Sequence, residues 1–159
     1  MLFSPGPSGT RNRGATVGYH RLSALTLAFA LSLALGACAL ITHYDPTSYK
    51  NATDLKAEAL LLMDKAKDPP GIHAAAIDGL LLKLRQAYEY ERGKGNPNML
   101  TVKQWELLIN PQGNLLGGFL QKWKVENRAQ SPTFIEETAK LVGKAFDQII
   151  ELERAKVKD

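Results

Sequence analysis

Apolar residues in this chain recur every three or four positions in several segments, which prolines and glycines separate. The first repeat consists of Ala52, Leu55, Ala59, Leu62 and Ala66. This spacing is typical of α-helices that bury one face. No stretch alternates apolar and polar residues long enough to favour a β-strand. The sequence therefore predicts an all-α fold, a small bundle of about four helices.

Two helix starts combine a capping residue with a proline at the first helical position, at Asp45-Pro46 and at Ser131-Pro132. A second helix is expected from the apolar repeat Ala74, Ile77, Leu81, Leu84 and Tyr88. Thr101 and Gln104 match a capping box, which predicts a short third helix from Thr101 to Asn110. Asn114 is expected to cap another short helical piece.

The last helix is expected to be the longest, from Pro132 to Val157. Its predicted apolar stripe consists of Ile135, Val142, Phe146, Ile149 and Leu152. Glu136 is expected to pair with Lys140 across one turn, as Arg85 does with Glu89 in the second helix. The charged end, Glu153 to Asp159, is expected to project or fray.

The only cysteine, Cys38, follows an apolar run and comes directly after Leu35, Gly36 and Ala37. Residues 22–35 contain only Leu, Ala, Ser, Thr and Phe, which suits the apolar core of a signal peptide and is short for a membrane span. Three arginines and no acidic residue precede this run. This arrangement resembles the lipobox of bacterial lipoproteins, in which signal peptidase cuts before a lipid-modified cysteine.

The resemblance implies a signal peptide over 1–37, a lipidated Cys38 with a tether over 38–45, and a helical domain over 46–159. Two acyl chains on the sulfur and one on the amine imply stable attachment to a membrane. An aspartate directly after the lipidated cysteine would resemble an inner-membrane retention signal, but this chain has Ala39 at that position. We therefore expect the protein in the outer membrane, facing the periplasm. The alternative is a buried thiol at the end of a plain transmembrane anchor.

Net charge argues against nucleic-acid binding. The whole chain has 20 Lys and Arg against 16 Asp and Glu. Removal of residues 1–37 leaves 17 basic against 16 acidic residues, because three arginines and no acid are lost. The basic character therefore belongs to the predicted signal peptide, and we expect no nucleic-acid partner.

No residue set in the predicted domain indicates catalysis or metal binding. Only His43 and His73 remain after the signal peptide, without further ligands at a metal-site spacing. Ser48 and Ser131 are explained by helix starts. The pairs Glu89 with Glu91 and Glu136 with Glu137 are expected to be solvated, and the Gly-Lys-Gly sequence at 93–95 lacks the remainder of a phosphate loop. We therefore expect no cofactor, no metal and no enzymatic activity.

Five residues are candidate contacts with a partner or a membrane: Tyr90, Lys122, Trp123, Lys124 and Arg128. Aromatic and basic residues together suit a membrane interface or an anionic partner. The alternative is a core tryptophan flanked by lysines whose charged ends reach solvent. Tyr90 lies off the predicted stripe and is expected to face a partner.

These observations favour a non-enzymatic accessory lipoprotein, a helical binding or scaffolding module with an envelope protein as its partner. The stretch from Tyr44 to Lys50 is weakly similar to the opening of other small bacterial lipoproteins, and no activity follows from that similarity. Two alternatives remain open. One is an envelope enzyme acting on peptidoglycan or lipid, and the other is a phage or plasmid exclusion lipoprotein.

Overall fold

The computed structural model describes residues 42–156, which form five α-helices and no strand. The predictions for Cys38, for Leu35 to Ala37 and for the signal peptide lie outside these residues. The α-helices are α2 Pro46–Asp64, α3 Ala74–Gly93, α4 Met99–Ile109, α5 Leu116–Glu126 and α6 Pro132–Ala155. Three short 3₁₀ helices connect them: η2 Lys65–Lys67, η3 Pro70–His73 and η4 Asn96–Asn98. The predicted all-α bundle is confirmed.

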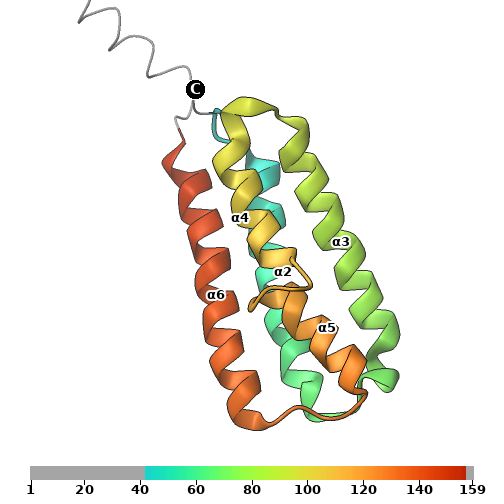
Figure 1. The fold of residues 1–159 in the computed structure, drawn as a ribbon. Helices are drawn as coiled ribbons and strands as arrows, with labels where there is room; N and C mark the ends of the chain where they lie inside the picture. Colours follow the sequence, from blue (N-terminus) through green and yellow to red (C-terminus); the bar gives the residue numbers. More distant parts are fainter. Residues whose placement is uncertain (1–41, 157–159) are drawn as a thin grey trace, which may run out of the picture. The chain divides into compact units, whose positions relative to one another are not determined.

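The helices lie side by side along one bundle axis, and α3 and α6 run opposite to α2 and α4 (Figure 1). α2 packs against α3 and α6, and α4 packs between α3 and α6. α5 contacts α4, α6 and η3. One end of the bundle, here called the tether end, gathers the starts of α2 and α4 and the ends of α3 and α6 (Figure 1). At the far end lie η2, η3, the end of α5 and the start of α6.

The predicted starts of α2 and α6 are confirmed. The Asp45 carboxylate accepts hydrogen bonds from the amides of Thr47 and Ser48. Ser131 Oγ accepts from the Phe134 amide at 3.3 Å. Each cap satisfies amides that a first helical turn otherwise leaves without a partner.

The predicted apolar repeats form the core, with small differences of register. All five residues of the first repeat are buried. In α3 Leu80 is fully buried in place of the predicted Leu81, which is only partly buried, and Ala74 is exposed. Trp105 and Phe146 meet edge to face, with ring centroids 6.0 Å apart, where α4 packs against α6. The core thus joins segments distant in sequence.

The predicted starts of α4 and α5 are wrong. α4 begins at Met99, two residues before the supposed capping box, because η4 leads directly into it. Thr101 is buried within the helix and caps nothing, while Gln104 Oε1 has no hydrogen-bond partner. α5 begins after Leu115, not Asn114, and no side chain caps it.

Gly117 lies inside α5 because its backbone contacts the end of α4. A Cβ atom at this position would lie 2.2 Å from the carbonyl oxygen of Ile109. No side chain fits at that distance, so the close approach of the two helices requires glycine. This contact offsets the weak helix propensity of the residue.

The predicted projecting end, Glu153 to Asp159, is wrong as far as Lys156, and its residues 157–159 lie outside the described part of the chain. The helix ends at Ala155, and both Glu153 and Lys156 are buried, with 1% and 5% of their surface exposed. The predicted pair of Glu136 and Lys140 does form, at 2.8 Å. Within residues 42–156, no helix has both the length and the apolar character needed to cross a bilayer.

Candidate functional site

Three apolar stripes end in buried polar residues at the tether end. On α2 the stripe begins with Ser48, on α3 it ends with Glu91, and on α6 it ends with Glu153. Together with four neighbours they form a network, here called the tether-end cluster: Asp45, Ser48, Glu91, Lys94, Asn98, Glu153 and Lys156. Charged groups so deeply buried require partners.

Ser48 and Lys94 join α2 to the end of α3. Ser48 Oγ donates to the Glu91 carboxylate and accepts a hydrogen bond from Lys94 Nζ. Lys94 Nζ also lies 2.9 Å from Asp45 Oδ2 and 3.2 Å from Glu91 Oε2. One ammonium group therefore bridges two carboxylates that belong to different helices.

Asn98 connects both parts of the cluster. Its Nδ2 donates to Glu91 Oε2 at 2.7 Å and to the Glu91 carbonyl oxygen at 2.8 Å. Its Oδ1 accepts from Lys156 Nζ at 2.9 Å, and Lys156 in turn contacts Glu153. Asn98 is 1% exposed, so a single amide side chain links α3, α4 and the end of α6.

The same cluster holds the first described residues of the chain. Thr42 Oγ1 donates to Asn98 Oδ1 at 3.2 Å. The Asp45 amide donates to Glu153 Oε1 at 2.7 Å. The segment 42–45, expected to be part of a tether, is therefore bound to the bundle by hydrogen bonds to α6 and to the turn before α4.

Hydrogen bonds and charges keep Asp45 and Lys94 ionised. Burial raises the pKa of Asp45, but hydrogen bonds from Lys94, Tyr90 and the Thr47 amide outweigh it and hold the pKa well below its usual range. Burial lowers the pKa of Lys94, but Asp45 and Glu91 outweigh that effect and raise it. Lys94 is therefore protonated at neutral pH.

The contact of Ser48 with Lys94 has the form of a nucleophile beside a base. A lysine acts as the base only when it is neutral, and the two carboxylates keep Lys94 charged. Ser48 is moreover only 4% exposed. This arrangement suits ion pairing and positioning of the segment 42–45, not nucleophilic attack by Ser48.

Tyr90 lies at the edge of the cluster and is 42% exposed. Its hydroxyl donates to Asp45 Oδ2 at 2.7 Å, and Lys94 Nζ lies 4.9 Å from the ring centroid. The hydrogen bond to Asp45 raises the pKa of Tyr90. Its ring thus combines a fixed hydroxyl with an accessible face.

Trp123 is a core residue, which agrees with the alternative of a core tryptophan flanked by lysines. It is fully buried, and its indole N–H donates to the Asp68 carbonyl at 3.0 Å. Lys122 Nζ lies over the Phe134 ring at 4.1 Å, and Lys124 pairs with Asp78 at 3.0 Å. The flanking lysines reach solvent.

Arg128 is exposed and lies 3.2 Å from Glu126. It follows α5 at the far end, whereas Tyr90 lies at the tether end (Figure 1). The candidate contacts therefore do not form one surface. α6, which joins the two ends, is about 36 Å long at about 1.5 Å per residue.

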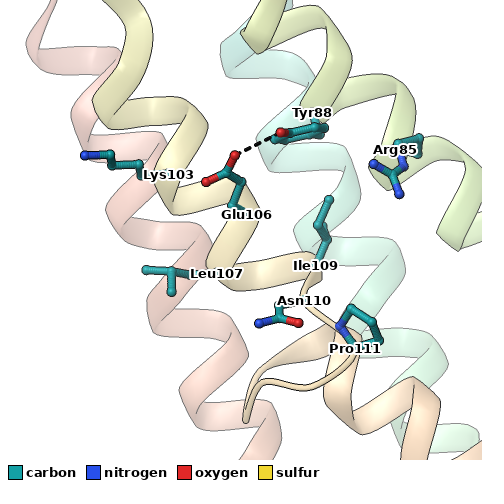
Figure 2. Close-up of a pocket in the computed structure, with 8 residues that line it drawn as sticks. All are labelled: Arg85, Tyr88, Lys103, Glu106, Leu107, Ile109, Asn110 and Pro111. Carbon is teal, nitrogen blue, oxygen red and sulfur yellow. Dashed lines mark hydrogen bonds between the residues drawn. The ribbon is translucent and has the colours of Figure 1, made fainter.

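Several grooves open on the sides of the bundle, and two of them combine an apolar wall with charged borders. Figure 2 shows the first, a hollow of about 540 Å³ along α3 and α4, where the Tyr88 hydroxyl donates to Glu106 Oε1 at 2.9 Å. Arg85 lies 5.8 Å from the Tyr88 ring centroid. This groove has an aromatic wall with charges of both signs beside it.

The second groove, about 760 Å³, runs between α2 and α6. Its apolar lining includes Leu60, Ile135 and Ala139. Ion pairs border it, including Lys56 with Asp147. Neither groove gathers an accessible nucleophile with a base.

Among residues 42–156 no three His, Cys, Asp or Glu side chains lie where they could hold a metal ion. His73 Nε2 lies 3.2 Å from Asp68 Oδ2, and its ring centroid is 5.8 Å from that of Trp123. His73 therefore packs against the core.

Sequence reasoning missed the tether-end cluster because it treated each member separately. Considered alone, the sequence around Glu91 predicts a solvated helix face, and that around Glu153 predicts a projecting helix end. The signal was present, since Ser48, Glu91 and Glu153 continue the apolar stripes at three-residue or four-residue spacing. Polar residues that continue three stripes at the same end of a bundle predict a buried network.

Comparison of the chain with protein-family models, with curated proteins and with solved structures finds no match.

Proposed function

We propose that this chain is a lipid-anchored accessory protein of the bacterial envelope, a non-enzymatic helical module that binds or scaffolds a protein partner. In this proposal Cys38 carries the lipid, and signal peptidase cuts after Ala37. The module faces the periplasm, and Ala39 favours the outer membrane over the inner one.

The observation that carries the proposal is the position at which the bundle holds its own N-terminal segment. Thr42 is bonded to Asn98 only four residues after Cys38, and the Asp45 amide is bonded to Glu153. A lipid on Cys38 would therefore attach to one end of the helices through a very short linker. Such attachment limits the partners to those in or near the same membrane.

A binding role is favoured over catalysis by the state of the polar groups. The buried Ser48 is bonded to a charged Lys94, which argues against an activated nucleophile. The grooves along α3 and α4 and between α2 and α6 offer apolar surface bordered by charges, which suits a protein segment.

The first test is metabolic labelling of the full chain with an alkyne analogue of palmitate in a Gram-negative host, compared with Cys38→Ser. Label on the native chain alone is the expected result. Absence of label on the native chain contradicts lipid anchoring.

The second test is crosslinking in living cells, followed by detergent purification and mass spectrometry. A reproducible envelope protein that is captured with the native chain and lost with Cys38→Ser is the expected result. A labelled chain that captures no protein argues against the binding module. Peptidoglycan or lipid hydrolysis that disappears in Ser48→Ala would instead favour the envelope enzyme.

A further inference from the structure

Two neighbouring apolar residues at the tether end are exposed to solvent. Met99 and Leu100 form the start of α4, and 44% and 61% of their surfaces are accessible. They directly follow Asn98, whose side chain accepts the hydrogen bond from Thr42. The apolar pair is thus adjacent in the chain to the point where the tether enters the bundle.

The length of chain between Cys38 and this point is short. From Cys38 to Thr42 the fully extended backbone reaches about 13 Å, at about 3.3 Å per residue. Amphipathic helices at a membrane surface bury their apolar face about 5–10 Å into the boundary between headgroups and acyl chains. A lipid on Cys38 would therefore keep the start of α4 within reach of the bilayer surface.

The cluster restricts the orientation of the bundle as well as its distance. The tether segment is held at two places, Thr42 on Asn98 and the Asp45 amide on Glu153. A segment bound at two points cannot pivot freely about its last hydrogen bond. A lipid on Cys38 would therefore turn the tether end toward the membrane and the far end away from it.

Other exposed side chains at the tether end also suit a bilayer surface. Lys103 lies one turn further along α4 and Arg154 lies in the last turn of α6, and neither forms an ion pair within the described residues. Tyr90 adds an exposed aromatic ring whose hydroxyl is fixed. Aromatic and cationic residues around a small apolar group are typical of interfacial contacts.

We propose that the tether end rests on the lipid bilayer, with Met99 and Leu100 inserted at the boundary between headgroups and acyl chains. This inference depends on lipidation of Cys38, as in the proposed function. It leaves both lateral grooves open to the periplasm and adds a second membrane contact beside the lipid.

The experiment uses the full-length lipidated protein in vesicles of phosphatidylethanolamine and phosphatidylglycerol. An acylated Cys38 has no free thiol, so Leu100→Cys supplies the single site for an environment-sensitive NBD label. Ile72→Cys is the matched control, because Ile72 is equally apolar, is 73% exposed and lies in η3 at the far end. Quenching by brominated acyl chains reports contact with the bilayer interior.

We expect at least threefold stronger quenching at position 100 than at position 72, with a blue-shifted emission. Equal, weak quenching at both positions with an acylated Cys38 overturns the orientation alone, and means that protein or solvent covers the apolar pair. Two labelled thiols per chain, with a mass that lacks lipid on Cys38, overturn the inference and the proposed anchor together.

Discussion

Removal of the Asn98 side chain is expected to destabilise the bundle strongly, because one amide bonds to two buried charged residues. Asn98→Ala removes the bond to Glu91 Oε2 at 2.7 Å and the bond from Lys156 Nζ at 2.9 Å. It also removes the bond to the Glu91 carbonyl oxygen at 2.8 Å and the contact with Thr42 at 3.2 Å. No water replaces these groups easily, since Asn98 is 1% exposed.

A hydrogen bond to a charged group contributes about 1.5–3 kcal/mol, and the loss is larger when a buried group has no other partner. Glu91 retains Lys94 and Lys156 retains Glu153, so the lower value applies to each bond. Two such bonds give a loss of about 3 kcal/mol in the free energy of unfolding. For a domain of this size the melting temperature should fall by about 12 °C.

The assay is urea denaturation of the full chain in detergent, followed by far-ultraviolet circular dichroism. Asn96→Ala is the matched control, because Asn96 lies in the same 3₁₀ turn with an exposed side chain. The control should change the free energy of unfolding by less than about 0.5 kcal/mol. Losses below that value for both variants would refute the bridging role of Asn98.

Three further results are expected from single substitutions. Gly117→Ala should lower the free energy of unfolding in urea by about 1–3 kcal/mol, because its Cβ would lie 2.2 Å from the Ile109 carbonyl oxygen. The control Gly79→Ala, with no atom within 4 Å of the added Cβ, should raise it by up to about 1 kcal/mol. Equal effects of the two substitutions would contradict the close approach of α5 to α4. The pKa of Asp45 is lowered in the fold, so its stabilisation is complete above its unfolded pKa of about 3.9 and is lost as the pH falls through the lower folded value. Asp45→Asn should therefore flatten the fall in melting temperature below about pH 4, and an unchanged profile would count against an ionised, hydrogen-bonded Asp45. Trp123→Phe should cost about 1–2 kcal/mol in thermal melts, because it removes the hydrogen bond of the indole N–H at 3.0 Å and some buried volume; a loss below about 0.3 kcal/mol would place the ring outside the core.

The helices were predictable wherever local signals and burial agree. Asp45-Pro46 and Ser131-Pro132 start helices because capping and the fixed φ of proline act within a few residues. The stripe of α2 is buried as its spacing predicts. The start of α4 was not predictable in this way, because Asn98 bonds to distant Glu91 and Lys156 instead of capping its own helix.

The tether-end cluster shows a different limit. Its members come from residues 45 to 156, and charge alone assigns such residues to the surface. The packing of α2, α3 and α6 brings them together, so each buried charge gains a partner only in the folded bundle. Close contacts such as that of Gly117 likewise depend on a neighbouring helix.

The two bonds that fix the tether segment also determine how a pulling force would enter the fold. Tension applied upstream of Thr42 would not strip α2 away one turn at a time, because Asn98 and Glu153 connect the entry point to α4 and α6. The helices would instead resist such tension together, because the two hydrogen bonds transmit it to α4 and α6. Without these two hydrogen bonds, the bundle would yield first at α2 under such tension.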